Sequence, residues 1–366
     1  MTIFDVFNAV LKKAVELKAS DIHISAGGPF RVRIKGEMVP MKAVEILKPS
    51  DTASIAGELM IAARKASREN VQQVVGALTD FDCSYALPEC SRFRVNICSQ
   101  RGSLSLVLRA IPFVLPSIDQ LGLPPVLREI ALEERGLVLL TGVTGSGKSS
   151  TLAAMIGHAN ENRAGKIVTI EDPIEFLHRD RRCTVIQREL GADTESFSRA
   201  LRAALRQDPD IVLVGEMRDK ETIDIAMKAA ETGHMVFSTV HTTDAPKTIS
   251  RLISVFEASE QTAIRMRLSE TLKAVVSQRL LARKDGEGRA LAAEIMRNTK
   301  TIQDCIANPE KTASMKDYIE KGREQYGMQT FDQHLADLYN QGVITMETAK
   351  AAATSPADFE RNLQYQ

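Results

Sequence analysis

One short segment of the sequence is rich in glycine and hydroxyl residues and ends in lysine and serine. It fits the pattern G-x-x-x-x-G-K-[ST], follows the apolar run 137–141 and precedes a helical pattern over 148–160. Glycines let consecutive backbone N–H groups face one point, and the positive end of the following helix lies at the same place. We therefore predict a phosphate-binding loop with these members: Gly142, Val143, Thr144, Gly145, Ser146, Gly147, Lys148, Ser149 and Ser150.

The last residues of this loop and one distant carboxylate predict the ligands ATP and Mg²⁺. Lys148 would reach the β- and γ-phosphates of ATP, and the Ser149 hydroxyl would ligate Mg²⁺. Glu216 follows the apolar run 211–214 and Gly215, where P-loop NTPases place a strand-terminal carboxylate. We predict that Glu216 acts on Mg²⁺, directly or through water, and belongs to the catalytic residues.

Polar residues also follow the other apolar runs, and parallel strands bring such residues to one crevice. Glu171 and Glu175 follow the run 167–170 and could accept a proton from the attacking water. A structural role for either one, capping or pairing with an arginine, is the alternative. His241 follows the run 235–240 and could sense the γ-phosphate by hydrogen bonding.

Three arginines complete the catalytic candidates. Arg202 and Arg206 lie four residues apart on a helix expected before the run 211–214. They could form a solvated basic face, or they could cross a subunit boundary and neutralise phosphate charge as arginine fingers. Arg218 lies two residues after Glu216 and is placed in the same group.

The first 110 residues predict a small α+β domain. Period-2 alternation indicates strands over 21–24, 31–34, 81–87, 92–97 and 103–108, with a turn at Lys35 and Gly36 and helical periods over 4–17 and 54–78. An antiparallel sheet accounts for this pattern over residues 1–110. Four prolines, at positions 112, 116, 124 and 125, then predict an interdomain linker over 111–126.

The remainder of the chain predicts a different architecture. Continuous apolar runs at 137–140, 167–170, 211–214 and 235–240 alternate with helical patterns, which indicates a parallel sheet covered on both faces. We predict an α/β core over 127–289. From about residue 290 the pattern becomes helical, with Phe331, Leu335 and Leu338 on one stripe, so 290–366 is expected to be a helical region.

The composition of the chain limits the classes of binding partner and the cellular compartment to be expected. With 366 residues, the chain is long enough for two or three compact units. The 47 basic and 47 acidic residues give a net charge of +0, which disfavours nucleic acid as a partner. No apolar stretch is long enough to span a membrane and no secretory signal is evident, so we expect a cytoplasmic protein. Five cysteines without a C-x-x-C pair argue against a disulfide framework or a four-cysteine zinc site.

Beyond these motifs, the chain resembles the type IV pilus retraction (twitching-motility) ATPases, the PilT/PilU branch of the type II/IV secretion ATPases related to GspE. The resemblance covers nearly the whole length. It is carried by the phosphate loop and by residues 20–23, 92–96, 171–175, 215–219, 233–242, 276–280 and 327–332.

This resemblance implies a PAS-like N-terminal domain, a RecA-like core and a C-terminal helical region, assembled as a ring of six with ATP between subunits. It also implies that Arg92 or Arg94 reaches toward the nucleotide, and that hydrolysis swings the N-terminal domains against the cores. The motor would act at the inner-membrane base of the pilus, on the platform protein and peripheral to the membrane, and would drive pilin disassembly.

Two departures from the family pattern stand out. Retraction ATPases of the principal type carry Ala-Ile-Arg-Asn-Leu-Ile-Arg-Glu where residues 301–308 read Thr-Ile-Gln-Asp-Cys-Ile-Ala-Asn, without either arginine. This favours an accessory, PilU-like motor or a divergent paralogue, either of which could depend on a companion ATPase. The second departure is Val143, where the family usually has proline, which should alter loop stiffness more than chemistry.

Two alternatives to a retraction motor stay open at this point. A pilus-assembly or type II secretion ATPase would hydrolyse ATP equally well and push subunits outward. A nucleotide-binding ring subunit would bind ATP with little turnover. An ATPase that acts on nucleic acid is disfavoured by the charge balance.

Overall fold

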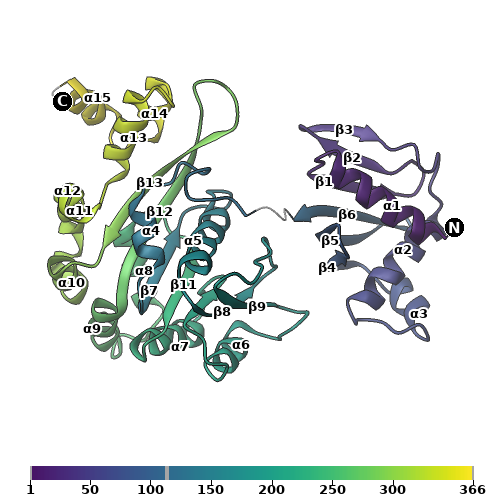
Figure 1. Ribbon diagram of the computed structural model, residues 1–366, viewed down its shortest axis with the longest axis horizontal. Coiled ribbons are helices and arrows are strands. Elements are labelled where there is room, and N and C mark those ends of the chain that lie inside the picture. The colour runs from purple at the N-terminus through teal and green to yellow at the C-terminus, as the bar shows by residue number, and fades with distance from the viewer. Residues whose placement is uncertain (1, 112–114, 365–366) are drawn as a thin grey trace. The chain divides into compact units, whose positions relative to one another are not determined.

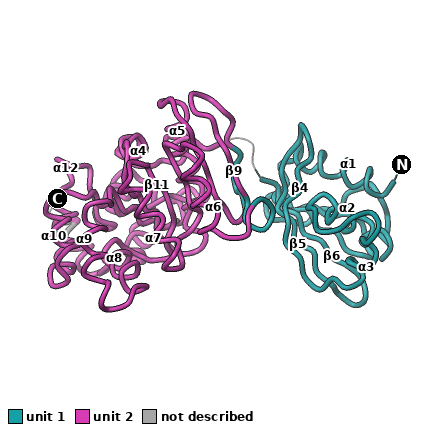
Figure 2. The backbone as a smooth tube through the Cα atoms, turned by 90° about the horizontal axis from the view of Figure 1, so that it is seen from below, with its two compact units in different colours: residues 1–114, 173–177, 189–193 teal, residues 115–172, 178–188, 194–366 magenta. Residues whose placement is uncertain are grey.

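The computed structural model describes residues 2–111 and 115–364, which form two compact units (Figure 2). The first unit consists of the N-terminal part of the chain together with two short later segments, Pro173–Leu177 and Glu189–Asp193. The second unit contains the rest. Of the predicted linker, residues 112–114 lie outside the described residues, and residues 115–125 form neither helix nor strand.

The N-terminal unit is built on one antiparallel sheet (Figure 1). Its elements are α1 (Ile3–Glu16), β1 (Asp21–Ser25), β2 (Arg31–Ile34), β3 (Glu37–Pro40), α2 (Pro49–Ala62), α3 (Val71–Gly76), β4 (Asp80–Leu87), β5 (Ser91–Gln100) and β6 (Ser103–Ile111). The strand order is β3-β2-β1-β6-β5-β4, and each neighbouring pair is antiparallel. The predicted α+β domain on an antiparallel sheet is confirmed.

Local sequence explains much of this unit. A capping box of Thr2 and Asp5 begins α1, whose apolar stripe buries Phe7 and Leu11 against the sheet. Lys35 and Gly36 both have positive φ, as a two-residue hairpin turn between β2 and β3 requires. The helical period predicted over 54–78 is divided between two helices, α2 and α3, which are separated by residues 63–70.

The second unit contains the remaining elements. They are α4 (Val126–Ala131), β7 (Gly136–Thr141), α5 (Lys148–Asn162), β8 (Gly165–Glu171), β9 (Cys183–Glu189), α6 (Phe197–Ala204), β10 (Ile211–Val214), α7 (Lys220–Glu231), β11 (Met235–Val240), α8 (Ala245–Ser254), α9 (Gln261–Thr271), β12 (Leu272–Ala282), β13 (Arg289–Arg297), α10 (Lys300–Ala307), a 3₁₀ helix (Pro309–Ser314), α11 (Met315–Lys321), α12 (Arg323–Tyr326), α13 (Phe331–Asn340), α14 (Met346–Ala352) and α15 (Pro356–Gln364).

A seven-stranded sheet in the order β13-β12-β7-β11-β10-β8-β9 forms the centre of this unit. The pairs β12·β7, β7·β11, β11·β10 and β10·β8 are parallel, and β12·β13 is antiparallel. All four predicted apolar runs are strands of this sheet. Along β7, Leu137 and Leu139 enter one hydrophobic core while Val138 and Leu140 enter the other, so both faces are covered as predicted.

The C-terminal part differs from the prediction at its start. A strand, β13, occupies Arg289–Arg297 and pairs with β12, so the expectation of helices from about residue 290 is wrong there, and helices begin at Lys300. Alanine-rich β13 has no aromatic residue and a single β-branched one, Ile295, and long-range pairing overrides its weak strand propensity. The predicted stripe of Phe331, Leu335 and Leu338 is buried on α13.

Candidate nucleotide site

The glycine-rich segment leaves the buried strand β7 and enters α5 at Lys148. Gly142, Gly145 and Gly147 have φ values of +143°, +78° and +91°, a region that other residues rarely adopt. A Cβ at Gly142 would lie 2.6 Å from the carbonyl oxygen of Gln278. The loop can turn tightly at these positions because no side chain obstructs it.

The interior of the loop is arranged to hold an anion. Lys148 is 8% exposed, and its Nζ donates to the carbonyl oxygens of Gly142 and Val143 over 2.8 and 3.0 Å. The Oγ of Ser146 is buried and has no hydrogen-bond partner within the described part of the chain. These groups lie where the 15-residue helix α5 begins. Phosphate oxygens fit such a cradle, because it offers a cation, a hydroxyl and the positive end of a helix.

The other members of the loop differ in exposure. Ser149 and Ser150 lie in the first turn of α5 and are half-buried, whereas Thr144 is exposed. Val143 is 62% exposed. The substitution at position 143 therefore leaves the interior of the cradle unaltered.

A second group of predicted residues meets at the end of β10. The Nε of Arg218 lies 2.7 Å from Oε2 of Glu216, and Nε2 of His241 lies 3.6 Å from the same oxygen. The Glu216 side chain is only 16% exposed. Residues from the ends of two strands, β10 and β11, are thus brought together, as the parallel sheet predicts.

Hydroxyl groups of β11 hold the backbone that carries Glu216. Ser238 donates from Oγ to the carbonyl of Val214, and Thr239 donates from Oγ1 to the carbonyl of Gly215, both over 2.7 Å. The N–H of Met217 donates back to the Thr239 carbonyl over 3.2 Å. These bonds fix the backbone on both sides of Glu216.

The two further carboxylate candidates are separated by the structure. Glu171 ends β8, and its Oε1 accepts hydrogen bonds from Oγ1 of Thr169 (2.6 Å) and Nε2 of Gln187 (3.1 Å). Glu175 is exposed and lies in the segment Pro173–Leu177, which belongs to the N-terminal unit. Glu171 alone belongs to the same unit as the phosphate loop.

Of the two arginines predicted to lie on one helix, only Arg202 lies on α6. Helix α6 ends at Ala204, so Arg206 lies beyond it in an exposed turn, and the expectation that both arginines share one helix is wrong. Arg202 remains on the helix and forms an ion pair with Glu221 of α7. Both side chains of that pair are about half exposed, which is typical of a solvated charged face.

Arg92 and Arg94 lie on β5 of the N-terminal unit. Nη2 of Arg92 donates to Oγ of Ser84 over 2.7 Å and to Oε2 of Glu189 over 3.0 Å. Glu189 is 3% exposed and also accepts the N–H of Ile174. Arg94 is exposed on the same strand. Within this unit the Arg92 guanidinium is bound to a buried carboxylate.

Gln278 belongs to none of the site motifs recognised in the sequence, and its side chain contacts the helix that follows the phosphate loop. Gln278 is 1% exposed on β12, and its Nε2 donates to Oγ1 of Thr151 on α5 over 2.8 Å. Its backbone carbonyl is the atom that closely approaches Gly142. The available signal was a glutamine two residues from the apolar Val276 and Leu280 on either side, the spacing of one strand face, because a buried amide requires partners.

Oxygen ligands for a cation are present near the loop. Across residues 2–111 and 115–364, no group of three or more His, Cys, Asp or Glu side chains is placed to hold a metal by itself. Mg²⁺ in nucleotide sites takes one or two protein oxygens and completes its shell with phosphate oxygens and water. The Ser149 hydroxyl and the Glu216 carboxylate are donors of that kind, so these residues fit Mg²⁺.

None of the helices in residues 2–111 and 115–364 has the length and apolar character needed to cross a membrane.

A parallel sheet with a phosphate loop after β7 and a carboxylate at the end of β10 defines the class of P-loop ATPases. The family model for "Type II/IV secretion system protein" matches residues 1–363. The chain belongs to this family and, within it, to the branch of the PilT and PilU pilus ATPases.

Individual relatives agree with this placement. The type IV pilus retraction ATPase PilT of Pseudomonas aeruginosa is 44% identical over 341 residues, which cover 93% of this chain and 96% of PilT. The type IV pilus ATPase PilU of the same organism is 40% identical and covers 96% of this chain and 90% of PilU. A crystal structure of the pilus retraction motor PilT with bound ADP has a TM-score of 0.86, at 41% identity over 99% of both chains.

Proposed function

We propose that this protein hydrolyses ATP as one subunit of a hexameric motor that drives type IV pilus retraction, the disassembly of pilin from the fibre base during twitching motility. One observation carries the proposal. A phosphate loop with a buried lysine lies in a chain that resembles the retraction motor PilT over 99% of both chains.

The first step of the proposed mechanism is binding of the triphosphate. The backbone N–H groups of the loop and the ammonium of Lys148 would bind the phosphates. Lys148 donates to two loop carbonyls, and a phosphate oxygen would replace these acceptors because a charge-assisted hydrogen bond is stronger. Ser149 and Glu216 would hold Mg²⁺, which supplies positive charge against the phosphates.

Glu216 and His241 are proposed to act on the attacking water and the γ-phosphate. Arg218 and His241 both approach the same Glu216 oxygen, which restricts the carboxylate to one orientation. Glu171, held by Thr169 and Gln187, is the second candidate for orienting the water. Glu175 would contribute only through the segment that belongs to the N-terminal unit.

The remaining arginines would supply positive charge to phosphate when the ring closes. Arg202 would have to exchange Glu221 for a phosphate of the neighbouring subunit, and Arg92 would have to leave Glu189. Of these two partners only Glu189 is buried, whereas Arg94 and Arg206 are themselves exposed. Positive charge at the γ-phosphate stabilises the transition state of phosphoryl transfer.

The proposed place of action is the cytoplasmic side of the inner membrane, at the base of the pilus machine. There the ring would bind the pilus platform protein and would lie peripheral to the membrane. The balanced charge of the chain supports a protein partner over nucleic acid.

An accessory role beside a companion ATPase is the second candidate function, and the structure of α10 supports it. Ile302, Cys305 and Ile306 are buried, so the packed face of this helix retains its apolar pattern. Gln303 and Ala307, which replace the two arginines of the family motif, are only half-buried. The replacement of the two arginines therefore removes positive charge from the surface of α10 and leaves its packed apolar face unchanged.

An assembly or secretion motor receives less support. The type II secretion system protein E of Xanthomonas campestris is 30% identical, and this chain spans about half of its length, 55%. The match to PilT is closer in identity and spans 96% of that protein.

Purified protein and genetics test the proposal together. Phosphate release from ATP should be lost in Lys148→Ala and Glu216→Ala. In cells that lack the gene, each variant should fail to restore twitching and should leave the cells hyperpiliated. Loss of pili altogether would instead indicate assembly. Normal ATP affinity without phosphate release by the parent protein would indicate a ring subunit with little turnover.

The accessory role needs a separate genetic test. If deletion of this gene alone leaves twitching intact, the companion ATPase should be deleted as well. If this chain alone then restores twitching in cells that lack both ATPases, it does not depend on a companion.

A further inference from the structure

Glu294 is a buried carboxylate outside the residues discussed so far. It lies on β13, is 4% exposed, and its Oε1 accepts the N–H of Ala245 over 2.8 Å. Ala245 is the first residue of α8, whose first N–H groups have no partner within the helix. The Glu294 carboxylate therefore accepts a backbone N–H group at the start of α8, although it lies on a strand 49 residues away in sequence.

No cation forms an ion pair with Glu294 within the described part of the chain, although two lie near it. Arg279 on β12 donates from Nη1 to the carbonyl of Ala352 over 2.5 Å, and its guanidinium lies 3.9 Å from the centre of the Phe331 ring. The carboxylate is thus buried beside an arginine that is bound elsewhere.

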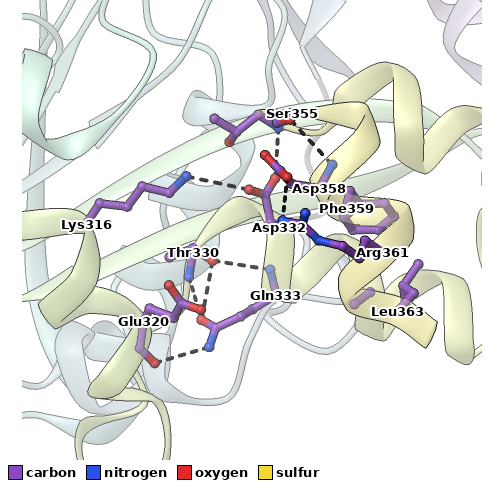
Figure 3. A pocket seen from close by; sticks show the side chains of 12 residues that line it. Lys316, Glu320, Thr330, Asp332, Gln333, Ser355, Asp358, Phe359, Arg361 and Leu363 are labelled. Carbon is purple, nitrogen blue, oxygen red and sulfur yellow. Dashed lines mark hydrogen bonds and ion pairs between the residues drawn. The ribbon is translucent and has the colours of Figure 1, made fainter. Parts of the chain in front are cut away.

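The second cation is Lys316 of α11. Figure 3 shows its side chain directed at Asp332, and the two groups are 3.6 Å apart. Both residues line a pocket of about 410 Å³ between the C-terminal helices. Lys316 is therefore paired with Asp332 at this pocket and not with Glu294.

The charges that face Glu294 come from three elements. Burial raises the pKa of its carboxyl to about 7, and the charge of Asp244 at the start of α8 adds to this rise. The positive charges of Arg279 on β12 and Lys316 on α11 lower the pKa of this carboxyl and so oppose the rise.

The first turn of α8 is bonded to the loop that carries His241. Asp244 caps α8 by accepting the N–H of Lys247 over 2.9 Å. The hydroxyls of Thr242 and Thr248 are 2.7 Å apart, and Thr248 also donates to the carbonyl of Asp244 over 2.7 Å. These bonds attach Thr242 and Asp244, which directly follow His241 in the chain, to the first turns of α8.

We propose that Glu294 is a positioning residue for ATP hydrolysis: by holding the N-terminus of α8, it sets the distance of His241 from Glu216. This inference rests on the proposed roles of His241 and Glu216 and goes beyond them. It assigns a role to a residue of the edge strand β13, which contacts neither group. A small displacement of a residue at the γ-phosphate costs far more in rate than in binding.

The decisive experiment compares two variants. Glu294→Leu removes the acceptor, whereas Glu294→Gln retains an oxygen that can accept the N–H of Ala245. We expect kcat for ATP hydrolysis to fall on the order of tenfold or more in Glu294→Leu, with KM for ATP changed less than about twofold. Glu294→Gln should retain most of the parent's kcat. Equal kcat in the parent and Glu294→Leu would overturn the proposal.

A matched control separates positioning from loss of stability. His334 is also buried and also accepts a backbone N–H of β13, that of Ala293, through Nδ1 over 2.9 Å. Among the described residues, no hydrogen bond joins the His334 side chain to α8. His334→Leu should therefore lower the thermal midpoint without lowering kcat. If both leucine variants lose kcat in proportion to their midpoints, Glu294 is only structural.

A double variant tests the route through His241. If Glu294 acts through that residue, adding Glu294→Leu to His241→Ala should lower kcat no further. An additional tenfold loss in the double variant would contradict the route. Full activity of His241→Ala alone would instead contradict the proposed role of His241, so the two failures can be told apart.

Discussion

The phosphate loop and the strand pair β12–β13 differ in how each is proposed to serve the nucleotide site. The loop is one contiguous stretch, and its glycines, lysine and serines lie within nine residues of sequence, 142–150. The strand pair contributes Gln278 and Glu294, which support α5 and α8 from more than 40 residues away. The loop is suited to contact the nucleotide, and the strand pair fixes the elements that carry the contacts.

Because of this difference, substitutions in the loop and in the strand pair should reduce different properties of the enzyme. A residue that contacts phosphate should affect binding and hydrolysis together, whereas a supporting residue should affect the rate more than the affinity. Lys148→Ala, Glu216→Gln and Gln278→Leu test this division, and Glu294→Gln tests the charge of the supporting carboxylate.

Lys148→Ala should produce the largest loss. It removes the buried ammonium from the cradle, and we expect kcat/KM to fall on the order of 10⁴-fold because phosphoryl transfer depends on such charge. Steady-state phosphate release and ADP titration should both show the defect. Unchanged ADP affinity would place Lys148 outside the contacting group.

Glu216→Gln should lower kcat on the order of 10³-fold while ADP still binds, because a neutral amide cannot accept a proton. The amide also cannot form an ion pair with Arg218. Single-turnover hydrolysis and ADP affinity, measured on the same preparation, check this. Arg218→Gln is the matched control and should cost less, because its side chain is 72% exposed.

Glu294→Gln should stabilise the protein at neutral and alkaline pH. The native pKa is raised to about 7, so the unfolded chain loses this proton at lower pH than the native state does. Stability of the parent should therefore fall as pH rises from about 4.5 to about 7, by up to about 3 kcal/mol. The glutamine variant should match the parent at pH 4.5 and melt higher at pH 8. Identical melting profiles across this range would contradict the raised pKa.

Gln278→Leu should have the smallest effect. It leaves the Thr151 hydroxyl without its partner, and such a loss costs about 1–3 kcal/mol of stability. We expect only a severalfold lower kcat, with ADP affinity nearly unchanged. A loss as large as that of Lys148→Ala would mean that Gln278 itself contacts the nucleotide.

The predictions from sequence succeeded where signals were local or continuous. The four apolar strands and the loop followed from short-range pattern, because buried parallel strands and glycine turns leave a mark at their own positions. Strand β13 was expected to be helical, and α6 ends before Arg206. These errors arose where propensity was weak and distant partners decided the outcome.

Assembly of the candidate site shows the same division. The sequence could place Glu216 and His241 at strand ends, and the parallel sheet brought them together. It could not separate Glu171 from Glu175, which belong to different units although they lie four residues apart. Nor could it pair Arg202 with Glu221 or Arg92 with Glu189, because each ion pair depends on packing between distant segments.

The sequence by itself determined the phosphate loop, the parallel sheet and the class of chemistry, because backbone freedom at glycine and apolar periodicity are properties of neighbouring residues. Only the tertiary structure decided which side chains support the helices next to that loop and next to His241. Gln278 and Glu294 acquire their roles through hydrogen bonds to helices remote in sequence, and a buried polar group is positioned by whatever partner the fold brings to it.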